Sequence, residues 1–104
     1  MPVSRMMIGE AISDDVVTEL VRLLQDHVRD IANLAGHSIL VEEGGRMVLL
    51  ITEFQNREDC LRYHSSRACR QLVASTQNLL IGSYVVKLFH QNRTESRQID
   101  SSHR

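Results

Sequence analysis

At 104 residues the chain has the length of one domain, and its 42% of hydrophobic residues suffice for a small core. Twelve basic and thirteen acidic residues leave a net charge of −1, which gives no general electrostatic basis for binding nucleic acid or an acidic membrane surface. No apolar run approaches the roughly 20 residues of a membrane span, and the N-terminus lacks a signal-peptide pattern. We therefore expect a cytoplasmic protein whose two cysteines are reduced.

The first half of the chain predicts a strand followed by an amphipathic helix. Residues 5–12 are mainly apolar and predict the strand. Ser13 is a suitable N-cap, and Asp14 and Asp15 fall in the first turn, where the helix dipole favours negative charge. Apolar residues then recur at intervals of three and four, which predicts a helix that ends at Gly36 as its C-cap. They are Val17, Leu20, Val21, Leu24, Val28, Ile31 and Ala35.

The second half predicts a hairpin, a helix and a last strand. Two β-rich runs within residues 37–54 flank Gly44 and Gly45, which favour a tight turn. Asn56 is the predicted N-cap of a second helix, and residues 82–90 predict the last strand. We assign residues 1–90 to one domain and expect residues 91–104 to form a polar, disordered tail.

The element order β-α-β-β-α-β predicts a ferredoxin-like α+β fold, in which two helices cover one face of an antiparallel four-stranded sheet. A sheet with one covered face should alternate apolar and polar residues. The third strand is instead apolar on both faces, since Met47, Leu49 and Ile51 alternate with Val48 and Leu50. We therefore predict a homodimer in which the two uncovered sheet faces pack together.

The segment that begins at Phe54 resembles the antibiotic-biosynthesis-monooxygenase (ABM) domains of the dimeric α/β-barrel superfamily. The matching positions are Phe54, Glu58, Asp59, Tyr63 and Ser66. With the element order, the resemblance covers about Met6 to His90. It implies a dimeric α/β barrel and a monooxygenase that uses no cofactor and acts on a small aromatic or quinol substrate.

The chain departs from the active ABM proteins at several positions. Phe54 stands where several oxygenases have Trp, and Tyr63 and Ala68 stand where His is common. Val73 falls near the axial His of the haem-degrading members, and because valine cannot ligate iron, haem degradation is disfavoured. These departures keep a second hypothesis open, a non-catalytic dimeric barrel that binds a small ligand.

Two residues compete for the catalytic role. On a continuous helix, Leu61, His64, Ala68, Leu72 and Leu79 share one stripe, which would turn His64 inward as a proton donor or acceptor. The resemblance instead implies a functional role for Tyr63, and a helix break at Ser65 and Ser66 would change the phase. Phe54 is the predicted substrate-binding residue, because its ring could stack on an aromatic substrate.

Metal binding is not expected. Cys60, His64 and Cys69 lack the paired spacing of zinc sites, and on a continuous helix the two cysteines lie about 13 Å apart along the axis. Cys60 lies near a helix N-terminus and near His64, but a packing role is the simpler prediction for both thiols.

Overall fold

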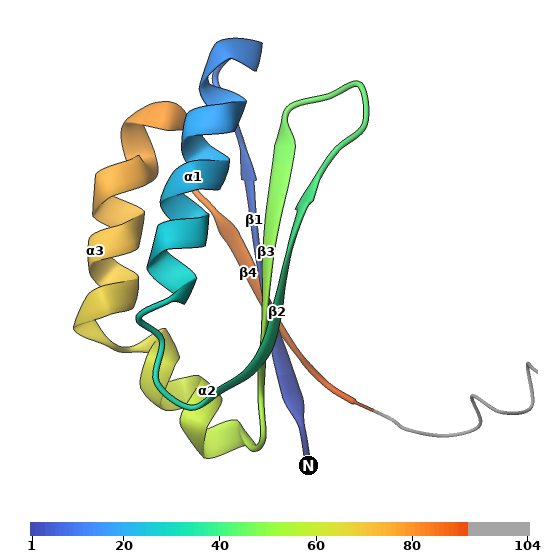
Figure 1. Cartoon of the computed structure of the whole chain (residues 1–104), viewed down its shortest axis with the longest axis vertical. Helices are drawn as coiled ribbons and strands as arrows, with labels where there is room; N and C mark the ends of the chain where they lie inside the picture. Colours follow the sequence, from blue (N-terminus) through green and yellow to red (C-terminus); the bar gives the residue numbers. More distant parts are fainter. Residues whose placement is uncertain (92–104) are drawn as a thin grey trace, which may run out of the picture.

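The computed structural model describes residues 1–91 (Figure 1). In chain order its elements are β1 (Val3–Glu10), η1 (Asp14–Val16), α1 (Val17–Val28), β2 (Leu34–Val41), β3 (Met47–Phe54), α2 (Arg57–His64), α3 (Arg67–Thr76), η2 (Gln77–Leu79) and β4 (Val85–His90). Of the tail predicted for residues 91–104, only Gln91 is described, and its N–H donates to the Pro2 carbonyl at 3.0 Å. The rest lies outside the described residues. None of the helices within residues 1–91 is both long enough and apolar enough to cross a membrane.

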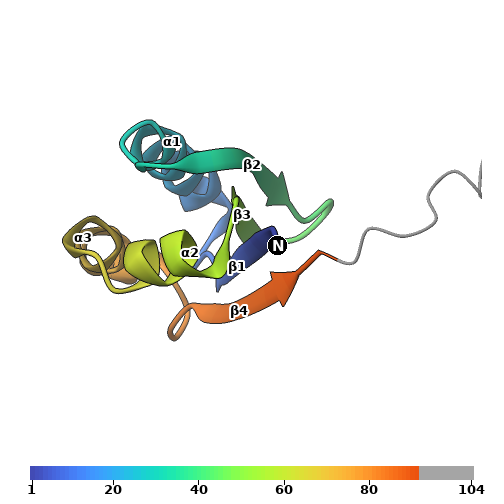
Figure 2. The same cartoon turned by 90° about the horizontal axis from the view of Figure 1, so that it is seen from below.

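The four strands form one antiparallel sheet in the order β2-β3-β1-β4. The helices α1, α2 and α3 all lie on one side of this sheet, and the other side is left bare (Figure 2). This arrangement confirms the predicted ferredoxin-like α+β fold. It differs in one respect, because the predicted second helix is divided into α2 and α3.

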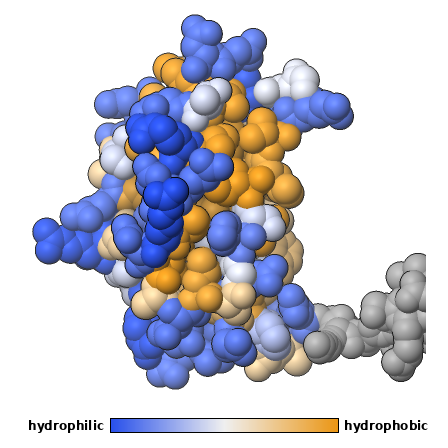
Figure 3. Space-filling view, in the orientation of Figure 1, coloured by the Kyte–Doolittle hydropathy of each residue, from blue (hydrophilic) through white to orange (hydrophobic). Residues whose placement is uncertain are grey.

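The two faces of the central strands differ as the alternating pattern of β3 predicts. Val48 and Leu50 are 1% exposed and pack under the helices against Leu20 and Leu24. Leu49 pairs with Ile8 and Leu40 on the uncovered face. The apolar residues of that face are Met6, Ile8, Leu40, Met47, Leu49, Ile51, Val85 and Phe89. Figure 3 shows hydrophobic residues gathered along the side of the molecule that the sheet forms.

The predicted end of the first helix at Gly36 is wrong. The helix ends at Val28, and a turn leads to Asn33, which has a φ of 60°. Asparagine tolerates this left-handed conformation, and Asn33 directly precedes β2 in the turn that follows the helix. Gly36 lies inside β2, where the register with β3 shifts. A glycine that follows apolar residues at helical spacing can cap a helix or mark an irregularity in a strand. Gly36 marks an irregularity in β2.

The β2–β3 hairpin is confirmed. Gly44 has a φ of 76°, which a residue with a side chain rarely adopts. The Glu42 N–H donates to the Met47 carbonyl at 2.8 Å and closes the turn.

Candidate functional site

The break between α2 and α3 decides which side chains face the sheet. Asn56 caps α2 as predicted, since its side chain accepts from the Asp59 N–H at 2.8 Å. Ser66 caps α3 in the same way, accepting from the Cys69 N–H at 3.1 Å. Because α3 begins anew after Ser66, its inward face does not continue that of α2. The buried residues are Cys60 and Tyr63 in α2, and Cys69, Leu72 and Thr76 in α3.

The stripe predicted for a continuous helix is therefore wrong. His64, Leu61 and Ala68 are exposed, whereas Leu72 is buried. Tyr63, which the family resemblance favours, is 6% exposed and faces inward. His64 still contributes to the interior through one ring nitrogen, because its Nδ1 accepts a hydrogen bond from Arg5 Nε at 3.1 Å.

Tyr63 forms a hydrogen-bonded pair with His27 at the end of α1. The Tyr63 hydroxyl lies 2.7 Å from His27 Nε2, and the two ring centroids are 5.8 Å apart. On its other side the Tyr63 ring stacks on Phe54, with centroids 5.7 Å apart. The pair joins residues that are 36 positions apart in the chain, and His27 was not among the predicted site residues.

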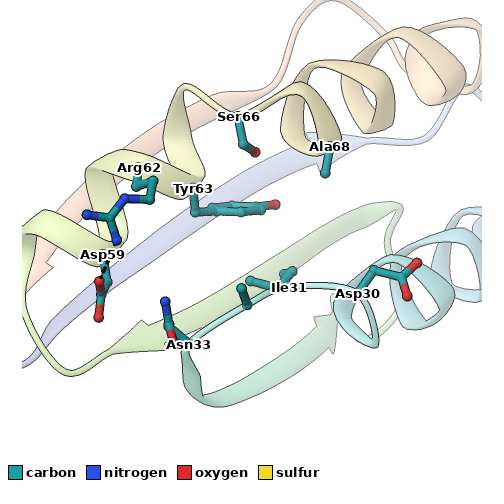
Figure 4. A pocket seen from close by; sticks show the side chains of 9 residues that line it. Asp30, Ile31, Asn33, Asp59, Arg62, Tyr63, Ser66 and Ala68 are labelled. Carbon is teal, nitrogen blue, oxygen red and sulfur yellow. Dashed lines mark hydrogen bonds and ion pairs between the residues drawn. The ribbon is translucent and has the colours of Figure 1, made fainter.

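Tyr63 borders a cavity of about 260 Å³ between α2 and the segment that follows α1. Figure 4 shows its ring between α2 and the segment that follows α1, with the hydroxyl directed toward the end of α1. The other lining residues are Asp30, Ile31, Ala32, Asn33, Asp59, Arg62, Ser66 and Ala68. The cavity therefore combines one aromatic ring with several polar and charged side chains, which suits a small planar ligand that carries polar groups.

Burial keeps both members of the pair neutral near pH 7. Desolvation is the main cause that lowers the pKa of His27; Arg5 lowers it further, and Asp30 partly opposes the shift. Desolvation also raises the pKa of the Tyr63 phenol. A neutral imidazole can accept a proton through Nε2, so the pair is able to take a proton from a ligand that bonds to the Tyr63 oxygen.

Phe54 is at the site but has no exposed surface. It belongs to a small buried cluster with Val3, Cys60, Tyr63 and Cys69, beneath the Tyr63 ring. Direct stacking of Phe54 on a substrate is incompatible with this position. Its contact with Tyr63 instead fixes the tyrosine ring.

Both cysteines are free and buried, in agreement with the packing role predicted for them. Burial raises the pKa of the Cys60 thiol. Within residues 1–91, no group of three or more His, Cys, Asp and Glu side chains is arranged to hold a metal ion.

The structure is a ferredoxin-like α+β domain in which the helices cover one face of a four-stranded antiparallel sheet. No family model matches the sequence, and no curated protein matches it. Several solved structures are similar to the chain in fold. The chain is similar to Rv0793 of Mycobacterium tuberculosis, with a TM-score of 0.74, 16% identity, and coverage of 92% of this chain and 100% of that chain.

Two further structures are similar at the same level. The monooxygenase ActVA-Orf6 of Streptomyces coelicolor, solved with nanaomycin D, has a TM-score of 0.74, 11% identity, and coverage of 89% of both chains. SnoaB of Streptomyces nogalater, a cofactor-independent oxygenase, has a TM-score of 0.72 and 10% identity over 91% of this chain and 97% of that chain. At these identities the comparisons establish the ABM fold, in agreement with the resemblance predicted from the sequence, while function depends on the site.

Proposed function

We propose that the protein is an ABM-type monooxygenase that works without a cofactor and oxidises a small aromatic or quinol substrate. The observation that carries this proposal is the 2.7 Å hydrogen bond between the Tyr63 hydroxyl and His27 Nε2 at the wall of a cavity. The fold shared with SnoaB and ActVA-Orf6 supports it.

In such a reaction the substrate itself supplies the electrons to O₂ once it is deprotonated. For a phenol or quinol that carries hydrogen on a ring carbon ortho or para to a hydroxyl, one oxygen atom enters at that carbon, the other leaves as water, and the product is a quinone. The chain must therefore take the phenolic proton, stabilise the resulting anion and limit water. Tyr63 would accept the substrate proton while passing its own to His27, and Phe54 would hold the Tyr63 ring in place.

Oxygen uptake with a panel of substituted hydroquinones and naphthols tests the proposal. We expect at least one member to consume O₂ with the purified protein faster than it autoxidises, with one O₂ used for each quinone formed and no hydrogen peroxide released. A metal chelator should leave the rate unchanged, which serves as the control for trace metals. Uptake at the rate of autoxidation for every member would contradict the proposal.

The alternative is a non-catalytic dimeric barrel that binds a small ligand. The near-complete burial of Tyr63 favours it, since only 6% of this residue is exposed to a ligand. Saturable binding of a panel member, with no oxygen uptake above autoxidation, would support this alternative.

The pH dependence of the activity should identify His27. The relay needs a neutral imidazole, and burial lowers the pKa of His27, so activity should stay constant at neutral pH. It should fall only below the ordinary imidazole pKa of about 6.5, because protonated His27 cannot accept a proton. The measurement is kcat/KM against pH, with a substrate whose own ionisation lies outside the range. A midpoint at or above about 6.5 would contradict the assignment.

The uncovered sheet face supports a homodimer built by sheet-to-sheet packing. Leu40, Met47, Val85 and Phe89 are between 38% and 51% exposed in the single chain. A continuous apolar surface of this kind is typical of an obligate interface, which commonly buries about 2,000 Å² or more. The dimer belongs to the proposal, as does the cytoplasmic location expected from the sequence.

A further inference from the structure

Arg5 is a buried cation on the helix-facing side of β1. It is 2% exposed, and it lies on the same face of the strand as the buried residues Val3 and Met7, two positions before and after it. Its Nε donates to His64 Nδ1 at 3.1 Å, and its terminal nitrogens approach the sulfur atoms of Cys69 at 3.4 Å and Met7 at 3.9 Å. Sulfur is a weak acceptor, so the two terminal nitrogens of the guanidinium have no strong acceptor.

No acidic side chain within residues 1–91 forms an ion pair with Arg5. The arginines that do form ion pairs in this part of the chain are Arg22, Arg29, Arg46 and Arg62, and all of them are at the surface. The Tyr63 ring, with its centroid 5.1 Å from the Arg5 Cζ, adds a cation–π contact but no negative charge. Burying a charge without a counter-ion is costly, which suggests that Arg5 receives an anion from outside the fold.

Arg5 lines a second cavity, of about 330 Å³, between α3 and the strands β1 and β4. Its basic and polar lining residues include Arg5, Arg70 and His64. Because His64 Nδ1 accepts from Arg5, the ring proton of neutral His64 is on Nε2, where it can be donated to a ligand.

The cavity also has apolar lining. Val73 and Val86 line it together with Tyr84. The Tyr84 hydroxyl bonds to Thr76 Oγ1 at 2.7 Å, and its ring lies so close to Gly9 that a Cβ there would come within 2.7 Å of it. Apolar side chains beside a buried guanidinium in one cavity suit a ligand with one charged end and one apolar end.

We propose that this cavity binds a small organic carboxylate, whose charged group displaces the weak sulfur contacts of the Arg5 terminal nitrogens and whose apolar body contacts Val73, Val86 and Tyr84. The planar fork of an arginine matches a carboxylate in a bidentate arrangement. Arg70, on the rim, adds positive charge. This cavity shares no lining residue with the cavity that Tyr63 borders. The proposal does not depend on the proposed oxygenase activity.

The Cys69 sulfur offers a competing explanation for the absence of an acidic partner at Arg5 within residues 1–91. Cys69 is the third residue of α3, near a helix N-terminus, and its sulfur lies 3.4 Å from an Arg5 nitrogen. A thiolate there would neutralise Arg5 internally and leave the cavity without an uncompensated cation. The cavity favours an external anion, since Arg5 lines a space of about 330 Å³ together with Arg70, His64 and apolar side chains.

Calorimetric titration of the full chain with benzoate tests the proposal at neutral pH and constant ionic strength. Benzamide has the same shape without the charge, and inorganic phosphate has the charge without an apolar body. We expect saturable binding of benzoate, with benzamide and phosphate each at least about tenfold weaker. Equal binding of either one would overturn the assignment to an organic carboxylate.

Arg5→Met is the matching variant, with Arg67→Met as its control. Arg67 is exposed and lies outside the cavity. Arg5→Met should lose at least about tenfold in benzoate affinity while the ligand-free protein melts at a higher temperature, because a buried charge is removed. Arg67→Met should change neither. Unchanged benzoate affinity in folded Arg5→Met would overturn the proposal.

The thiolate alternative has its own readout in the unmodified protein. A thiolate absorbance in the ultraviolet at neutral pH that disappears in Cys69→Ser, together with no benzoate binding, would overturn the proposal in favour of an internal Arg5–Cys69 ion pair. Benzoate binding that persists in Cys69→Ser would support the carboxylate site.

Discussion

Replacing Leu50 by aspartate should leave the protein unfolded, while the same change at the neighbouring Leu49 should leave it folded. Leu50 is 1% exposed and belongs to the main core. An aspartate there would be buried without a partner, which costs about 4 kcal/mol or more. That is a large part of the total stability of about 5–15 kcal/mol expected for a small domain. Circular dichroism and thermal melting of the two variants measure the difference.

Leu49 provides the matched comparison, because it lies on the uncovered face beside Ile8 and Leu40. Leu49→Asp should fold but should place two carboxylates in the predicted dimer interface, so light scattering at micromolar concentration should report a monomer. A dimer that survives Leu49→Asp would show that this face is not the interface. A folded Leu50→Asp protein would contradict the assignment of the two faces.

Tyr63→Phe should reduce kcat/KM of the proposed oxygenase by about 100-fold or more, because it removes the hydroxyl that links the substrate to His27. The ring and its stacking on Phe54 remain, so the fold should be kept. The loss of one hydrogen bond to His27 should lower the free energy of unfolding by only about 1 kcal/mol. Steady-state oxygen uptake and thermal melting, measured on the same preparation, separate the two effects.

His64→Gln is the control for Tyr63→Phe. His64 is exposed, and its contact is with Arg5 at the other cavity, so this variant should retain most of the oxygenase activity. The opposite result, with activity lost in His64→Gln and kept in Tyr63→Phe, would move the reaction to the Arg5 cavity. If both variants were fully active, neither residue would belong to the site.

Most of the fold could be predicted from local patterns. The order of strands and helices, the turn at Gly44 and the Asn56 cap all depend on residues within a few positions of one another. The end of the first helix was mispredicted because Asn33 and Gly36 are both able to stop a helix. Only the pairing of β2 with β3 shows that Gly36 belongs to a strand.

The site was predicted only in part. Tyr63 was identified through the family resemblance, but its partner His27 and the buried Arg5 were not. The sequence did contain a signal for Arg5, because this charged residue lies between Val3 and Met7 on a strand face that is otherwise apolar. For His27 the sequence offers no comparable signal, because a histidine on the flank of an amphipathic helix is ordinarily a surface residue.

The sequence by itself determined the element order, the two apolar faces of β3 and the possibility of a helix break at Ser65 and Ser66, because propensity, periodicity and capping act over a few residues. Only the tertiary structure decided that the break occurs and that Tyr63 rather than His64 faces inward. It also decided which distant groups meet. Tyr63 bonds His27 across 36 positions, and Arg5 reaches His64 and Cys69 across 59 and 64. The physical reason is that such contacts follow from how the helices pack on the sheet, and this packing is set by the whole core rather than by any short segment.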